Sequence, residues 1–397
     1  MKRMFVACLM LLMLVFFIAD RSCLAAGNLE ETKKLAGYIN ENLSPNQIPE
    51  IVALLDQGAD VDVTNLRGRT LLMFACSNGH AEIVNLLLDR GAQLEKATTD
   101  EVTPLFVASE YGKLDIVRIL LNRGAQVDRE TKNGDAPLYI ALKNGHLDCA
   151  KVLLDKERAA DAAASSKALF QYLNRGNGDI GVVELLLSEG ADIKYKDEQF
   201  QITFLDNASH YGMADAVRVL IDHGADVNAK NGEGNTPLFA AAHEKRAKVA
   251  DILIQKGAEL NIQNIYGYTP LRAACKEGAI DIARLLLSKG AKTDIKDDKG
   301  DTPLHTAVDT GNQDMASLLL QYGANINAAG RYADTPLHVA VARRDAAMVK
   351  MLVQKGADLA IKNEKDDTPY DLAVKRDFGE VLELLKTRQL KNPPFRI

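Results

Sequence analysis

Apolar residues recur along the chain with helical spacing, in pairs of short blocks separated by glycine. One example is the segment GDTPLHTAVDTGNQDMASLLLQYGANINA, which begins at Gly300. The apolar positions of its first block are Leu304, Ala307 and Val308, and those of its second block are Met315, Leu318 and Leu319. Thr302 and Pro303 are typical of a helix N-cap and first turn, whereas Gly311 and Gly323 are typical of left-handed helix ends. The segment therefore predicts a helix, a turn, a second helix and a loop.

This pattern repeats with a period of 33 residues. The threonine that precedes Pro-Leu recurs at Thr103, Thr236, Thr269, Thr302, Thr335 and Thr368, with degenerate versions at Thr70, Ala136 and Thr203. A Gly-Ala pair recurs independently, beginning at Gly58, Gly91, Gly124, Gly190, Gly224, Gly257, Gly290, Gly323 and Gly356. A unit of this size cannot bury the apolar sides of both helices alone, so neighbouring units must stack into a solenoid.

The repeated motifs resemble those of the ankyrin repeat family. The resemblance is carried by T-P-L-H at 302–305 and 335–338, by Gly-His at 79–80 and 145–146, and by endings such as VNLLLDRGA at 84–92. The residues predict an all-α solenoid of about eleven units including caps, on the order of 100 Å long if helices pack 8–10 Å apart. The resemblance implies a left-handed superhelical array whose loop tips and first helices form the concave face.

We expect the array to occupy residues 27–390, followed by a short tail at 391–397. Its N-terminal cap spans about 30–65, and a more charged C-terminal cap spans about 364–390. A degenerate unit covers about 157–190, where Glu157-Arg158 replaces Gly-Ala and Lys167-Ala168-Leu169 fills the Thr-Pro-Leu slot. Because the segment after Arg158 is rich in alanine, we expect the helix begun near Leu147 to continue past Arg158 and the loop to be lost. This unit is either a decayed repeat or a functional feature, namely a hinge or a notch in the binding face.

The first 26 residues have the pattern of a secretory signal peptide. A basic start is followed by sixteen uncharged residues from Met4 to Ala19 and then by the small residues of SCLAAG. Cleavage near Ala25 or Ala26 would export the protein to the periplasm or outside the cell. The alternatives are an uncleaved membrane anchor, for which the apolar stretch is short, and lipid modification of Cys23.

Charge and cysteine content limit the partners and the chemistry. Removing residues 1–26 takes Lys+Arg from 48 to 45 and Asp+Glu from 54 to 53, so the net charge becomes −8. This sign argues against a nucleic-acid or anionic-membrane partner. The remaining cysteines, Cys76, Cys149 and Cys275, lie in units too far apart for a disulfide, and we expect them to be buried.

The sequence contains no motif for nucleophilic, phosphate-binding or two-His zinc chemistry, so it predicts no enzyme, small-molecule substrate, cofactor or metal. His305 and His338 occupy the T-P-L-H slot, where an inter-unit hydrogen bond is expected. His210 and His243 stand 33 residues apart in equivalent slots, and a metal shared between them would need two more ligands.

Function is therefore expected to depend on surface positions that stacking does not determine. Aromatic and histidine residues at loop tips and first-helix ends form the predicted partner-binding set, namely Tyr111, Phe200, His210, Tyr211, His243, Tyr266, Tyr268 and Tyr332. The alternative is that these are single exposed aromatics of no consequence. The predicted function is a non-enzymatic scaffold that binds a protein partner. Narrower alternatives are an immunity or inhibitor protein for a secreted enzyme, and an envelope stress-protection factor.

Overall fold

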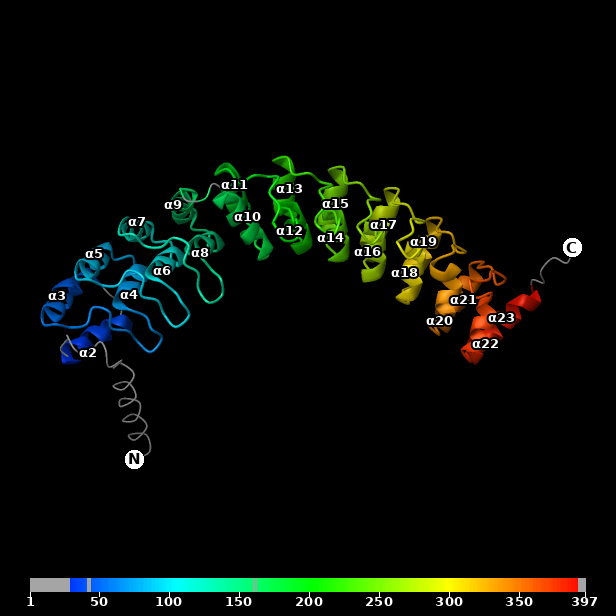
Figure 1. Ribbon diagram of the computed structural model, residues 1–397, viewed down its shortest axis with the longest axis horizontal. Coiled ribbons are helices and arrows are strands. Elements are labelled where there is room, and N and C mark those ends of the chain that lie inside the picture. The colour runs from blue at the N-terminus through cyan, green and yellow to red at the C-terminus, as the bar shows by residue number, and fades with distance from the viewer. Residues whose placement is uncertain (1–28, 41–43, 160, 162, 392–397) are drawn as a thin grey trace, which may run out of the picture. The chain divides into compact units, whose positions relative to one another are not determined.

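The computed structural model describes residues 29–40, 44–159, 161 and 163–391, and in this part it contains 22 α-helices (Figure 1). The helices form eleven pairs joined by turns and loops. Within the described residues there is no β-strand, and isolated bridges join Thr64 to Thr70 and Lys196 to Thr203. The predicted all-α repeat architecture of about eleven units is thus confirmed.

The chain divides into two compact units, the first unit and the second unit, each of which contains several repeats. The first comprises the described parts of Met1–Tyr172 and Glu184–Asp192, and the second comprises those of Leu173–Val183 and Ile193–Ile397. The first unit holds α2 (Leu29–Gly37), α3 (Ile48–Asp56), α4 (Leu71–Asn78), α5 (Ala81–Asp89), α6 (Pro104–Glu110), α7 (Leu114–Asn122), α8 (Pro137–Lys143) and α9 (Leu147–Arg158). Two helices, α10 (Ala164–Asn174) and α11 (Ile180–Ser188), contribute residues to both units.

The second unit holds the remaining twelve helices, α12 (Phe204–Tyr211), α13 (Ala214–Asp222), α14 (Pro237–His243), α15 (Ala247–Gln255), α16 (Pro270–Glu277), α17 (Ile280–Ser288), α18 (Pro303–Asp309), α19 (Gln313–Gln321), α20 (Pro336–Ala342), α21 (Ala346–Gln354), α22 (Pro369–Lys375) and α23 (Gly379–Lys391). The first helices of its pairs, from α12 to α20, lie side by side in one row, and α13, α15, α17 and α19 lie in another (Figure 1). Equivalent positions of successive first helices are therefore neighbours in space.

Threonine caps begin most of the first helices, as the sequence predicts. The side-chain oxygen of the N-cap threonine accepts the N–H of the residue three positions later at Thr70, Thr103, Thr203, Thr236, Thr269, Thr335 and Thr368. Ala136 occupies the same position before α8 with the same extended backbone, but it offers no side-chain acceptor. The first helices end where predicted as well, since Gly311 has a φ of 70° directly after α18 and its cap.

A repeated hydrogen bond joins several neighbouring repeats near the start of the loop. The backbone N–H of Glu259 donates to Asn228 Oδ1, that of Lys292 to Asn261 Oδ1, and that of Asp358 to Asn327 Oδ1, each at 2.9 Å. Each bond spans 31 residues, so a polar side chain at this position fixes the register between stacked units. The degenerate unit keeps this link by another route, because the N–H of Asp192 donates to Ser166 Oγ at 2.8 Å.

A second repeated bond runs along the first helices. His305 Nε2 lies 3.1 Å from the carbonyl oxygen of Asp334, and His338 Nε2 lies 2.9 Å from that of Asp367. The predicted inter-unit bonds of these two histidines are confirmed. Arg272, at the equivalent position of α16, reaches the carbonyl oxygen of Asp301 at 3.1 Å in the same way.

The degenerate unit differs from the prediction in one respect. The helix begun at Leu147 ends at Arg158 and α10 begins at Ala164, so the expected continuation past Arg158 is wrong, although the long loop is indeed missing. Asp161 explains the break, because its carboxylate accepts the N–H of Ala163 at 2.8 Å just before α10. Consequently Lys167 lies inside α10 and does not begin a helix.

Side chains around Glu189 replace the missing loop. The Glu189 carboxylate pairs with Lys151 at 2.9 Å and with Arg158 at 2.7 Å, and its backbone carbonyl accepts from Ser165 Oγ at 2.7 Å. These contacts join α9, α10 and the end of α11. The Arg158 guanidinium, at 2.9 Å, and the Ser165 hydroxyl thus both donate to a helix-end carbonyl that would otherwise lack a hydrogen-bond donor.

Cys76, Cys149 and Cys275 are free and buried, as expected. None of the described helices combines the length and the apolar character that crossing a bilayer requires. The predicted signal peptide at 1–26, Cys23 and the predicted tail beyond Lys391 lie outside the described residues.

Candidate functional site

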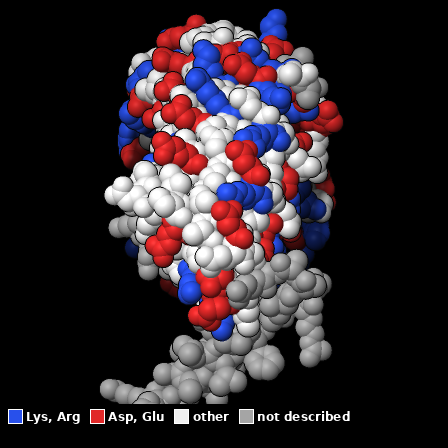
Figure 2. All heavy atoms as spheres, turned by 90° about the vertical axis from the view of Figure 1, so that its left-hand side faces the viewer, with Lys and Arg blue, Asp and Glu red and all other residues white. Residues whose placement is uncertain are grey.

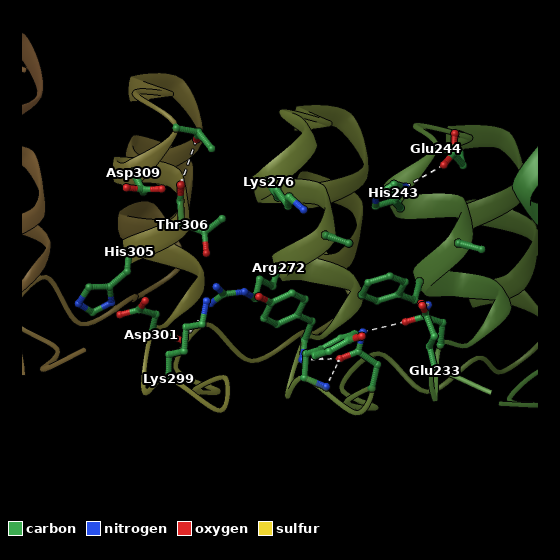
Figure 3. Close-up of a pocket in the computed structure, with 18 of the residues that line it drawn as sticks. Glu233, His243, Glu244, Arg272, Lys276, Lys299, Asp301, His305, Thr306 and Asp309 are labelled. Atoms are coloured by element: carbon green, nitrogen blue, oxygen red, sulfur yellow. Dashed lines mark hydrogen bonds and ion pairs between the residues drawn. The ribbon is translucent and has the colours of Figure 1, made fainter. Parts of the chain in front are cut away.

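A groove of about 920 Å³ runs along the first helices of the second unit. Its lining comes from α12, α14, α16, α18 and α20 and from the loops that precede them. Figure 3 shows that the side chains of Arg272, Lys276 and Thr306 project into it from α16 and α18. The groove follows from the repeat, because every unit contributes its first helix and its loop to the same side.

Six of the eight residues predicted to contact a partner line this groove, namely His210, Tyr211, His243, Tyr266, Tyr268 and Tyr332. Tyr266 and Tyr332 are exposed, whereas Tyr268 is half-buried. Tyr111 belongs to the first unit, where it caps the end of α6 and is exposed. Phe200 is exposed in the loop before α12, and its carbonyl accepts the N–H of Gly232 at 2.7 Å, but it does not line the groove.

The tyrosines of the loop tips are held by arginines. The Arg272 guanidinium lies 4.4 Å from the centre of the Tyr268 ring, and the Tyr266 and Tyr268 rings lie 5.9 Å apart. Arg272 is also paired with Asp297 at 2.7 Å, and the Asp297 side chain is 0% exposed. The aromatic side of the groove is therefore fixed in place, and the positive charge of Arg272 is already neutralised.

Histidines and glutamates alternate across the ends of α12, α14 and α16. Glu244 lies 2.8 Å from His243 Nδ1 and 3.6 Å from His210 Nδ1, and His243 Nε2 lies 3.6 Å from Glu277. Burial alone would raise the pKa of Glu244, but the hydrogen bond from His243 and the neighbouring positive charges lower it below the ordinary value. Figure 3 shows the contact between His243 and Glu244.

These four side chains do not assemble a metal centre. In the part of the chain that the structure describes, no three His, Cys, Asp or Glu side chains are grouped as metal ligands. The histidines face glutamates through hydrogen bonds and longer ionic contacts, an arrangement that holds the side chains along the rim of the groove.

Asp206 and Asn207 form the floor of the groove at its α12 end. Each is 4% exposed. Asp206 Oδ2 accepts the N–H and the hydroxyl of Thr203, both at 3.0 Å, while its Oδ1 has no hydrogen-bond partner among the described residues. Burial raises the pKa of Asp206 to about 6, although the hydrogen bonds from Thr203 and the charge of Lys196 oppose this shift.

His305, further along the groove, is held as a neutral imidazole. Its Nδ1 accepts the backbone N–H of Thr302 at 3.2 Å, so this nitrogen carries no proton and Nε2 donates to the carbonyl of Asp334. Burial lowers the pKa of His305, which keeps the ring uncharged at neutral pH. His305 therefore supports the groove by joining two neighbouring repeats.

Sequence reasoning missed the residues of the floor. Asn207 and Thr306 stand four residues after the N-cap threonine, where α14 and α16 have Ala240 and Ala273. The sequence signal that could have revealed them is a polar residue at a position where other repeats have alanine and where stacking buries the side chain. Lys276 was missed because a charged residue on a helix is ordinarily exposed to solvent.

The first compact unit contains a smaller cavity of about 230 Å³ beside the degenerate repeat. Glu157 lines it, and burial together with the charges of Asp128 and Asp161 raises the pKa of Glu157 to about 7. Acidic and basic side chains are otherwise interspersed over the surface seen in Figure 2, with no large area of one sign.

Comparison with known families accounts for the repeats. A family model described as ankyrin repeats in three copies matches residues 43–131, 92–167, 123–197, 169–264 and 259–330, and a second, described as ankyrin repeats in many copies, matches 319–373. No curated protein matches the chain.

Proposed function

Because the chain belongs to the ankyrin repeat family, we propose that it is a non-enzymatic scaffold whose groove in the second unit holds a protein partner. Ankyrin repeats imply protein partners in general, and only such repeats match this chain.

The observation that carries the proposal is the convergence of tyrosines and histidines on one groove. Six residues chosen from the sequence as surface aromatics and histidines line it together, although they come from units spread over residues 210–332. Aromatic side chains supply large contact area at small entropic cost and are enriched among the residues that dominate binding energy. Arginines at 4.4 and 4.6 Å from the Tyr268 and Tyr332 rings hold two of them in position before a partner arrives.

We also propose that the protein acts outside the cytoplasm, in the periplasm or cell envelope. This rests on the basic, apolar and small-residue pattern of residues 1–26. Sequencing the N-terminus of the protein recovered from the envelope fraction should give a chain beginning at Ala26 or Gly27. A chain that retains Met1 and stays with the cytoplasmic fraction would contradict export.

Site-specific photocrosslinking in the native host tests the groove. A photoreactive amino acid replaces Tyr266, which is 48% exposed in the groove, and in a matched control it replaces Tyr322, which is 42% exposed at the end of α19 and does not line the groove. We expect position 266 to capture a defined protein that position 322 does not capture. Equal capture at both positions, or none at 266, would refute the assignment.

A further inference from the structure

The groove has two ends of opposite character, and each contains buried polar atoms that lack a partner. At the α12 end, Asp206 Oδ1 and Asn207 Nδ2 have no hydrogen-bond partner among the described residues, and both residues are 4% exposed. Glu233 and Glu244 line the same end. A buried polar group without a hydrogen-bond partner is unfavourable, so a ligand that pairs it regains this free energy on binding.

Glu244 is already paired with His243, whereas Asp206 makes no ion pair with another described residue. The charge of Lys196 acts on Asp206, but the ammonium group of Lys196 donates to the carbonyl of Lys230 at 2.9 Å. When Asp206 is ionised, its Oδ1 can accept a hydrogen bond but cannot donate one. The neighbouring acids also favour a positive charge at this end of the groove. The α12 end therefore fits a basic side chain.

The other end has two positive charges without a partner. Lys276 of α16 and Lys299 of the loop before α18 line the groove (Figure 3), and neither ammonium group pairs with another described residue. The hydroxyl of Thr306, on a residue only 9% exposed, is likewise unpartnered and lies on the same stretch of floor. A carboxylate can accept from both ammonium groups and from the hydroxyl.

Two acidic residues at this end already have partners within the protein. Asp309 pairs with Arg343 at 2.8 Å, and Asp301 Oδ1 accepts the N–H of Arg331 at 2.8 Å. Asp301 keeps its negative charge, but the unpaired ammonium groups of Lys276 and Lys299 give an acidic side chain two cations to pair with at this end.

Apolar and aromatic side chains are prominent in the stretch between the two ends. Ala240 and Ala273 form its floor, and Phe239, Tyr266 and Tyr268 line its side. Asp206 and Lys276 are two helices apart, and Asp206 and Thr306 are three helices apart. With packed helices 8–10 Å apart, the two ends are separated by roughly 16–30 Å. An extended peptide rises about 3.3 Å per residue, so it covers this distance in roughly five to nine residues.

We propose that the groove binds an extended segment of the partner, with a basic side chain at Asp206, a backbone carbonyl at Asn207 Nδ2, and an acidic side chain at Lys276, Lys299 and Thr306. The two side chains are five to nine residues apart, with apolar residues between them. A polypeptide supplies both charges over such a span. This inference rests on the proposed function, because it specifies what the same groove holds.

Selection from a displayed library of random peptides on the purified full-length protein tests the inference, with twelve or more residues in each peptide. The enriched peptides should share one Lys or Arg and one Asp or Glu at the proposed spacing. Asp206→Asn should remove the preference for the basic residue alone. The double variant Lys276→Glu/Lys299→Glu should reverse the preference at the other end from acidic to basic. The matched control is Lys248→Glu/Lys289→Glu, which makes the same charge change at exposed positions on and beside the second helices, outside the groove.

Binding of one enriched, fluorescently labelled peptide gives the magnitude. Each groove variant should weaken its binding at least tenfold, and the control should change it less than threefold, with unaltered circular dichroism in all variants. Enriched peptides without the spaced pair, an equal effect of the control, or no enrichment at all would overturn the inference. Photocrosslinking at position 266 tests the proposed function separately, since a partner can occupy the groove with a folded surface that no short peptide reproduces.

Discussion

Replacing Asp206 by asparagine should make the protein more stable at neutral pH. The folded state buries this carboxyl group to 4% exposure and raises its pKa from 3.8 to about 6. Between these two values the folded chain binds more protons than the unfolded chain, so the stabilising contribution of the neutral group is lost as the pH rises through about 6. Above that pH the buried charge costs about 3 kcal/mol, at 1.36 kcal/mol for each pKa unit.

Asparagine removes the charge and keeps the hydrogen bonds. Its side-chain oxygen can accept the N–H and hydroxyl of Thr203 as Asp206 Oδ2 does now. Asp206→Asn should therefore raise the free energy of unfolding by about 2–3 kcal/mol at pH 7.5, and by only about 0.5 kcal/mol at pH 4, where the folded wild type is already protonated. Urea denaturation of both proteins at the two pH values measures the difference, and hydrogen exchange over Phe204–Tyr211 locates it in α12.

Asp371 provides the matched control. It occupies the same position in the capping box of Thr368, but it is more exposed and hydrogen bonds from Thr368 lower its pKa. A lowered pKa stabilises the folded state above the unfolded-state value, so Asp371→Asn should not stabilise the protein at pH 7.5. If Asp206→Asn destabilises the protein at pH 7.5, or stabilises it equally at both pH values, the assignment of a costly buried charge is wrong.

Three further predictions concern the stacked units. His338→Ala should cost about 2–4 kcal/mol of unfolding free energy, because the buried Thr335 N–H and Asp367 carbonyl both lose their partner; a loss below about 1 kcal/mol in urea denaturation would count against this role. Ala136→Thr should stabilise the protein by about 1 kcal/mol by restoring the missing cap, since Ala136 borders a cavity with room for the larger side chain, and a lower thermal midpoint would show that the hydroxyl does not reach α8. Burial raises the pKa of Cys275 to about 12, so this thiol should react with a disulfide reagent at pH 8 only after unfolding, and rapid labelling of the folded chain would contradict its burial.

The fold could be predicted from the sequence because the same local signals recur many times along the chain. Thr302, Gly311 and Gly323 each have one local role, and the same local roles recur in most units with a period that leaves stacking as the only way to bury the apolar faces. The degenerate unit shows the limit of this reasoning. The alanine-rich segment favours a continuous helix by propensity, but Asp161 accepts an N–H at the start of α10 and the chain turns instead.

The candidate site could be predicted only in part. The aromatics at loop tips could be found because their positions are not determined by stacking, and the period places Tyr266 and Tyr332 on the same side. Asp206 could not be distinguished from Asp371 by sequence, since both follow a threonine cap by three residues and differ only in burial. Whether a lysine such as Lys276 is paired depends on side chains one unit away, which the pattern of a single unit does not contain.

The most direct test of the central claim is the affinity of the crosslinked partner, once purified, for groove variants of this protein. Isothermal titration calorimetry should show that Tyr266→Ala combined with Lys276→Glu weakens binding at least a hundredfold, whereas Tyr322→Ala leaves it within threefold of the wild type. Binding that survives the groove substitutions, or that is lost with Tyr322→Ala, would contradict the account.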